Sequence, residues 1–100
     1  MNPKPEGVSA GEPVLEFESV SLFPAGHDMA RMRGVSFRLE PGCVMIILAE
    51  SGNERLPLAD AAEGLIAPES GRVRFRGADW LRMSPRTQAE ARGRIGRVFD

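Results

Sequence analysis

The feature that most constrains this chain is an unbroken apolar run, Cys43–Ala49, with no polar residue inside it. A strand covered on both faces in a parallel sheet has this composition, whereas a strand with one wet face alternates. The run leads into a loop that contains Gly52, and a helical pattern follows. The sequence therefore predicts a buried strand, a loop and a helix in succession.

The predicted helix covers residues 57–66, because its apolar positions recur with the period of an α-helix. Pro57 suits the first helical position, where no backbone N–H is needed. We expect this helix to pack on the strand formed by Cys43–Ala49. The apolar stripe that carries the prediction consists of Leu58, Ala61, Ala62 and Leu65.

Two stretches before the apolar run predict a pair of strands. Residues 14–23, "VLEFESVSLF", alternate between apolar and polar with one irregular step near Ser19. Residues 33–40, "RGVSFRLE", alternate again and then reach the turn signal Pro41–Gly42. We expect the two strands to pair. The inward positions of the second are Val35, Phe37 and Leu39.

The last third of the chain predicts a strand, a helix and a final strand. Residues 72–77, "RVRFRG", place two apolar side chains on one strand face and three arginines on the other. Residues 84–93 form a helix with Ser84 as N-cap and Pro85 at the first position. Residues 94–100, "RIGRVFD", form the last strand.

The composition fits one small soluble domain or a piece of a larger one. The chain has 100 residues, of which 42% are hydrophobic and 27% are charged. No apolar run approaches the roughly 20 residues of a membrane span. Residues 1–13, with three prolines, predict a flexible leader without the apolar core of a secretory signal. A cytoplasmic location follows, with the single Cys43 as a small buried residue and His27 in a solvated turn.

Four stretches in order resemble the N-terminal part of an ATP-binding cassette (ABC) nucleotide-binding domain. They are "VLEFESVSLFPAG", "MRGVSFRLEPGCVMIILA", "EGLIAPESGRVRFRGADW" and "MSPRTQAEARGRIGRVFD". The resemblance spans residues 14–100, which it implies are a partial nucleotide-binding domain. The implied fold class is α/β of the P-loop NTPase-like (ABC ATPase) type, as its N-terminal portion. That portion comprises an antiparallel β subdomain plus the start of the parallel core sheet.

The phosphate loop implied by the resemblance departs from the family pattern, G-x-x-x-x-G-K-[ST]. The second glycine approaches the phosphate closely, and a glutamate side chain opposes that. An arginine keeps the lysine's charge but not its compact shape. A leucine in the last place has no oxygen for Mg²⁺, and the proline after it has no N–H. The vestigial loop positions are Ala49, Glu50, Ser51, Gly52, Asn53, Glu54, Arg55, Leu56 and Pro57.

The resemblance implies ATP and Mg²⁺ as ligands, and these departures predict that binding is weak or absent. Phe23 matches the aromatic that stacks on adenine, or else it caps the core of the strand hairpin. Asp100 stands at the Q-loop position, where the family has a glutamine. The family's signature helix, its catalytic glutamate and its switch histidine match no residue here. We therefore assign no catalytic residue and no metal ligand, and enzyme activity stays open.

Three hypotheses about the function remain. The first is a diverged ATP-binding subunit, or a fragment of one, on the inner face of the cell membrane. Its implied partners are membrane-embedded transporter subunits and a second nucleotide-binding subunit. The second is an inactive ABC-like scaffold that acts as a protein interaction or regulatory module. The third, a polyanion site on Arg72, Arg74 and Arg76, is disfavoured because no aromatic interleaves with them, so we expect no nucleic acid.

The partial length carries a further expectation about how the chain behaves on its own. Half of the family's core sheet would be missing, which would expose edge strands and apolar faces. We therefore expect dimerisation or aggregation rather than a stable monomer.

Overall fold

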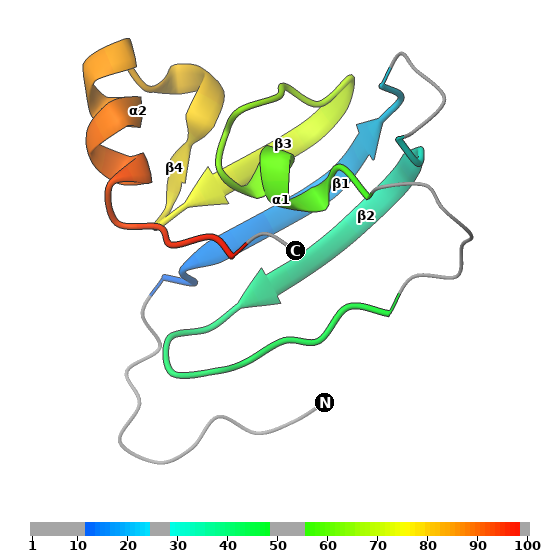
Figure 1. Cartoon of the computed structure of the whole chain (residues 1–100), viewed down its shortest axis with the longest axis horizontal. Coiled ribbons are helices and arrows are strands. Elements are labelled where there is room, and N and C mark those ends of the chain that lie inside the picture. Colours follow the sequence, from blue (N-terminus) through cyan, green and yellow to red (C-terminus); the bar gives the residue numbers. More distant parts are fainter. Residues whose placement is uncertain (1–11, 25–28, 49–55, 99–100) are drawn as a thin grey trace.

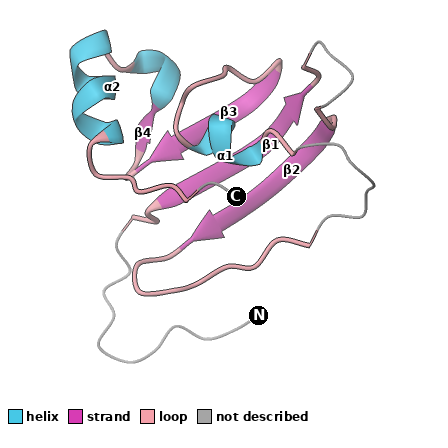
Figure 2. Ribbon diagram, viewed as in Figure 1, coloured by secondary structure: helices cyan, strands magenta, loops and turns pink. Residues whose placement is uncertain are grey.

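The computed structural model of the chain describes residues 12–24, 29–48 and 56–98, which are drawn in colour in Figure 1. Four strands form one antiparallel sheet in the spatial order β2-β1-β3-β4. Figure 2 shows a short helix in front of this sheet and a longer one at its β4 end. The elements are β1 (Leu15–Leu22), β2 (Met32–Leu39), α1 (Leu58–Ala62), β3 (Ser70–Phe75), β4 (Ala78–Asp79), the 3-10 helix η1 (Trp80–Arg82) and α2 (Pro85–Arg92).

The predicted pairing of the first two strands is confirmed, including its irregular step. Ser19 has a φ of 51°, and the register of β1 shifts here against both of its neighbours. The extra residue keeps Phe17 and Val20 on the same inward face, although they are three apart in sequence. On β3, a Cβ at Gly71 would overlap the carbonyl of Ser19, so only glycine fits opposite this bulge.

The structure also confirms the next predicted strand and helix. They are Ser70–Phe75 and Pro85–Arg92, where the sequence predicts 72–77 and 84–93. In β3, Val73 and Phe75 are buried, as their alternation predicts. At the start of α2, the Ser84 hydroxyl accepts a hydrogen bond from the Thr87 N–H at 3.2 Å, and Pro85 takes the first helical position. Local sequence signals suffice here because each element is capped or patterned by its own residues.

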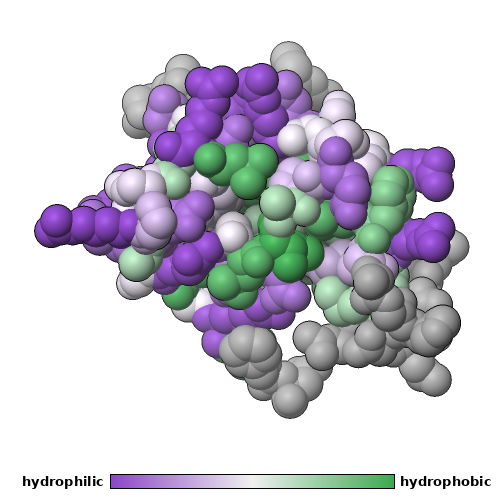
Figure 3. All heavy atoms as spheres, turned by 90° about the horizontal axis from the view of Figure 1, so that it is seen from above, coloured by the Kyte–Doolittle hydropathy of each residue, from purple (hydrophilic) through white to green (hydrophobic). Residues whose placement is uncertain are grey.

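One hydrophobic cluster joins β1, β2, β3, α1 and η1. The rings of Phe17 and Phe37 stack with centroids 4.5 Å apart, and those of Phe75 and Trp80 stack at 5.6 Å. Space-filling atoms in Figure 3 show apolar residues gathered between hydrophilic ones on the face seen there. The buried members of the cluster are Phe17, Val20, Leu22, Met32, Ala61, Val73, Phe75 and Trp80.

The predicted buried strand over Cys43–Ala49 is wrong for the part that the structure describes. Residues 43–48 form no strand, and Figure 2 draws them as loop. Val44, Ile46 and Leu48 are 92%, 80% and 91% exposed. A strand of this kind needs paired neighbours and two covering layers. The described residues supply no parallel neighbour, so the apolar composition alone does not order it.

Cys43 is exposed, which corrects the prediction that it is a buried small residue. The final strand predicted over residues 94–100 is wrong for its described part, because residues 94–98 form no strand. The start of a parallel core sheet is therefore not found among the described residues. What the structure contributes to the fold class is the small α/β arrangement around an antiparallel sheet.

The helix predicted over 57–66 is shorter and packs elsewhere. It ends early because Gly64 adopts a φ of 71° and reverses the chain. The Gly64 N–H donates to the Ala61 carbonyl at 3.0 Å, and the Leu65 N–H donates to the Asp60 carbonyl at 2.9 Å. This pair of bonds is a Schellman motif, in which a glycine follows the last helical turn. The helix packs on β3, and residues 43–48, where the predicted partner strand would lie, form no strand.

Candidate functional site

The phosphate-loop positions that the structure describes are the last two, at the entry to α1. Leu56 is 36% exposed, and Pro57 is fully buried. Pro57 stands at the N-cap, one residue before the predicted place, and its carbonyl accepts from the Ala61 N–H at 3.1 Å. The positions from Ala49 to Arg55 lie outside the described residues, as does Asp100.

These two positions do not fit a magnesium nucleotide. The leucine offers no oxygen to a hard cation, and the proline offers no N–H to a phosphate. In the described ranges no group of three or more His, Cys, Asp or Glu residues could hold a metal ion. Nor does any helix in the described part have the length and apolarity needed to cross a bilayer.

Phe23, the predicted adenine-stacking residue, lies just after β1. Its ring is 36% exposed, and the Arg33 guanidinium carbon lies 5.4 Å from the ring centroid. The Phe23 N–H donates to a Glu69 carboxylate oxygen at 3.0 Å. The Arg33 guanidinium thus already lies over one face of the phenyl ring, in a cation–π contact. Its role towards adenine stays a prediction.

A second set of contacts, which the sequence interpretation missed, surrounds α1. Arg97 Nη1 donates to Asp60 Oδ1 at 2.6 Å and lies 3.4 Å from Glu63 Oε2. Asp60 lies in α1 and Glu63 is its C-cap. Because the two acids are three residues apart, they lie on the same side of the helix. All three side chains are largely covered, at 16% to 23% exposure. The hydrogen bond to Asp60 raises the pKa of Arg97, and burial acts in the opposite direction.

The C-terminal end of α1 is held by Arg92, the last residue of α2. Arg92 Nε donates to the Glu63 carbonyl at 2.9 Å, and its Nη2 donates to the Gly64 carbonyl at 2.8 Å. These carbonyls belong to the helix end, where the backbone lacks helical donors. The same guanidinium lies 5.5 Å from the ring centroid of Trp80.

The Trp80 ring packs against the C-terminal end of α1. Its indole N–H donates to the Ala62 carbonyl at 3.1 Å. A Cβ added at Gly64 would overlap the Trp80 ring, so the glycine allows this close approach as well as the turn. In the sequence, the only signals for this arrangement are the arginine excess after residue 72 and the glycine of "EGL".

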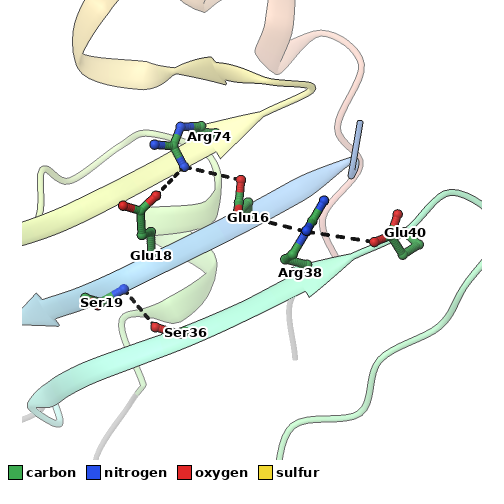
Figure 4. Close-up of polar contacts among 7 residues, drawn as sticks. All are labelled: Glu16, Glu18, Ser19, Ser36, Arg38, Glu40 and Arg74. Carbon is green, nitrogen blue, oxygen red and sulfur yellow. Dashed lines mark hydrogen bonds and ion pairs between the residues drawn. The ribbon is translucent and has the colours of Figure 1, made fainter. Parts of the chain in front are cut away.

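In the arginine stripe predicted over residues 72–76, Arg74 is paired with acids of β1. Arg74 Nη1 donates to Glu18 Oε2 at 2.6 Å and to Glu16 Oε1 at 3.2 Å (Figure 4). The hydrogen bond and charge of Arg74 lower the pKa of Glu18, and the charge of Arg72 adds to this. Arg38 of β2 lies 3.9 Å from Glu16, so the row of alternating charges continues across three strands. Arg74, the middle residue of the stripe, is therefore already paired with carboxylates, which weakens the argument for a polyanion site.

Comparison with known proteins identifies the source of these sequence patterns. No family model matches the chain. Over 94 residues, or 88% of the chain, it is 34% identical to the oligopeptide transport ATP-binding protein OppD of Mycobacterium bovis. It is 36% identical over 89 residues to the methionine import ATP-binding protein MetN of Myxococcus xanthus. The chain is a relative of the ATP-binding proteins of ABC transporters.

The cell division ATP-binding protein FtsE of Escherichia coli is a further relative, at 30% identity over 87 residues. The match to MetN and that to FtsE each cover 87% of the chain. The chain spans only 15% of OppD, 27% of MetN and 39% of FtsE. The predicted resemblance to an ABC nucleotide-binding domain is therefore confirmed, and it concerns a part of such a protein. The sheet that the structure describes is antiparallel, so the prediction of a P-loop NTPase fold rests on these relatives alone.

Proposed function

We propose that this chain is part of a diverged ABC transporter ATP-binding subunit whose grip on MgATP is weak or lost. Its partners would be membrane-embedded transporter subunits and a second nucleotide-binding subunit at the cytoplasmic face of the membrane. The 100 residues supply no complete hydrolytic site, so we assign no catalysis to them. The observation that carries the proposal is the pair Leu56 and Pro57 at the entry to α1, in a relative of ATP-binding proteins.

The physical argument is the loss of favourable contacts together with added repulsion. A phosphate cradle works through successive N–H groups, a compact cation and a metal held by a hydroxyl. Proline and leucine remove one N–H and the hydroxyl. Two glutamates, Glu50 and Glu54, add negative charge to the loop sequence. At 4 Å from a phosphate oxygen, each such charge costs roughly 1 kcal/mol in bulk water and ~4 kcal/mol at an effective dielectric of 20.

The test is a calorimetric titration of the full chain with MgATP, beside a variant in which the family loop is restored. The restored loop carries Ala49→Gly, Glu54→Gly, Arg55→Lys and Leu56→Ser. We expect no binding, or millimolar binding, by the original chain and a gain of at least about tenfold on restoration, equivalent to ~1.4 kcal/mol. Micromolar binding by the original chain that Arg55→Ala abolishes would contradict the proposal.

A second candidate is the inactive ABC-like scaffold, and the contacts around α1 favour it. Arg92 and Arg97 hold α1 through groups that do not depend on a nucleotide. On this hypothesis the loop has no residual use for phosphate, and the surrounding elements serve a protein partner. A scaffold shows no binding at any nucleotide concentration, so in the same titration any measurable binding by the original chain argues against this second candidate. Weak binding that competes with excess ADP supports the diverged subunit instead.

A further inference from the structure

Residues 44–48, called the exposed run here, have the side-chain pattern of a strand without a strand's hydrogen bonds. From Val44 to Leu48 the residues are 92%, 40%, 80%, 43% and 91% exposed. A period of two is typical of extended backbone, in which successive side chains point to opposite sides. Val44, Ile46 and Leu48 therefore form one outward row. Among the described residues, no backbone hydrogen bond joins the exposed run to another segment.

The turn before the exposed run explains why it does not form a hairpin with β2. The Glu40 carbonyl accepts a hydrogen bond from the Cys43 N–H at 3.2 Å, and Gly42 has a φ of 78°. With Pro41 preceding the glycine, this is the pattern of a type II turn. Such a turn splays the strands that it joins, whereas tight hairpins use the mirror-image types. The backbone of the exposed run is therefore available to a strand from another molecule.

The charges on either side of the exposed run favour an antiparallel copy of the same segment. Between Glu40 and Glu50 the sequence contains no charged residue. In a parallel, in-register pair each glutamate stands at the level of its own copy, and like charges directly opposite are destabilising. In an antiparallel pair centred on Ile46, each glutamate stands at the level of a glycine. These glycines are Gly52 for Glu40 and Gly42 for Glu50.

We propose that the exposed run is a self-association surface, on which a second copy of this chain pairs antiparallel about a two-fold axis at Ile46. A two-fold contact requires a surface that is complementary to itself. Every cross-strand pair in this register is apolar, and pairing gives the free backbone groups hydrogen-bond partners. The pairs are Val44 with Leu48, Met45 with Ile47, and Ile46 with its own copy.

The association is weak, because a two-stranded pair has few residues and no covering layer. We therefore expect it in concentrated solution and not at the low protein concentrations of unfolding experiments. It requires no nucleotide, so it is independent of the proposed function.

The first test is disulfide cross-linking of the full chain under mild oxidation, in a Cys43→Ser background. Directly opposite residues have Cα atoms about 4.5–5.5 Å apart, a distance that a disulfide spans. Ile46→Cys places two sulfurs across the two-fold axis, so we expect a covalent dimer. Val44→Cys places them about 13 Å apart along the strands, so we expect none. Adding Leu48→Cys to Val44→Cys should restore the cross-link.

The matched control is Leu81→Cys, because Leu81 is an apolar residue of η1 that is 61% exposed outside the exposed run. It measures cross-linking by random collision. Sulfurs held within a complex react at a high effective concentration, so Ile46→Cys should cross-link at least about tenfold faster than this control.

The second test is sedimentation equilibrium over a range of concentrations. Ile46→Lys places two ammonium groups opposite each other, so we expect the association constant to fall by at least about tenfold. Leu81→Lys is the matched control and should leave it unchanged. Ile46 is 80% exposed, so the substitution removes little buried surface from the monomer, and circular dichroism checks that the sheet is retained.

The proposal is overturned if Val44→Cys cross-links as fast as Ile46→Cys, because that result indicates a parallel, in-register stack. Cross-linking of Ile46→Cys at the rate of Leu81→Cys also overturns it, as does a chain that stays monomeric at every concentration. If Ile46→Lys does not fold, the cysteine variants still decide. A failure here leaves the proposed function untouched, because neither measurement uses MgATP.

Discussion

The antiparallel sheet and the apolar run that follows β2 differ in how well the sequence predicts burial. In β1 and β3 the alternation predicts which side chains are buried, and Phe17, Val20, Val73 and Phe75 are buried as expected. In Cys43–Leu48 the composition is more apolar, yet Val44, Ile46 and Leu48 lie almost fully exposed. Alternation specifies one apolar face, which a single covering layer buries, whereas a uniformly apolar strand needs a covering layer on each face.

The largest expected effect tests whether the sheet core carries the stability of the chain. Phe17→Ala removes a ring that is 1% exposed and stacked on Phe37, so we expect a loss of about 3–5 kcal/mol in the free energy of unfolding. Phe23→Ala is the matched control, since that ring is 36% exposed, and it should cost less than about 1.5 kcal/mol. Urea unfolding followed by circular dichroism measures both. Equal losses would show that burial in the sheet does not decide stability.

The next effect compares one residue type in the two regions. Val20 is fully buried in β1, and Val44 is 92% exposed in the apolar run. We expect Val20→Ala to cost about 2 kcal/mol and Val44→Ala to stay within about 0.5 kcal/mol. The measurement is again the midpoint and slope of urea unfolding. A cost at Val44 similar to that at Val20 would mean that residues 43–48 are covered in solution, for example by a second copy of the chain, and sedimentation would then reveal the dimer.

These comparisons show how far the sequence alone could reach. The bulge at Ser19, the face of β3 and the cap of α2 follow from residues within a few positions of each other. The early end of α1 was within reach too, because the glycine of "EGL" is a normal helix terminator. The prediction of a ten-residue helix relied on the apolar stripe and gave no role to Gly64. In the structure, Gly64 lies against the Trp80 ring, and the helix ends before it.

The candidate site was less predictable because its parts are far apart in sequence. Nothing near Arg92 or Arg97 indicates that their partners are Gly64 and Asp60, since such pairs form only when the fold brings them together. The family resemblance did place the loop and its departures, and the relatives confirm that resemblance. The assignment of each loop residue stays a prediction, because most of those positions lie outside the described residues.

A smaller effect concerns the N-cap of α2. Its hydroxyl satisfies one of the free N–H groups of the first turn, so Ser84→Ala should lower the free energy of unfolding by about 1 kcal/mol. Ser84→Asp keeps an acceptor at the cap and should stay within a few tenths of a kcal/mol of the original chain. Thermal unfolding of the three proteins measures the order. If alanine and aspartate are equally damaging, the cap is not the source of the effect.

The smallest effect is electrostatic and depends on pH. The hydrogen bond and charge of Arg74 lower the pKa of Glu18 below its ordinary value of 4.5. A carboxyl group whose pKa falls on folding stabilises the folded state above the unfolded value. That contribution is complete at pH 7 and is lost as the pH falls below 4.5 through the folded pKa.

Glu18→Gln should therefore be less stable than the original chain at pH 7, by less than the effect of Ser84→Ala, because surface ion pairs are weak. The difference should shrink as the pH falls below 4.5 and also in high salt, which screens exposed charges. In an Arg74→Gln background, Glu18→Gln should have little pH-dependent effect, because the main cause of the shift is gone. A difference that persists unchanged to pH 2 would instead assign the loss to packing of the side chain against β3, and the charge row in Figure 4 would then contribute nothing to stability.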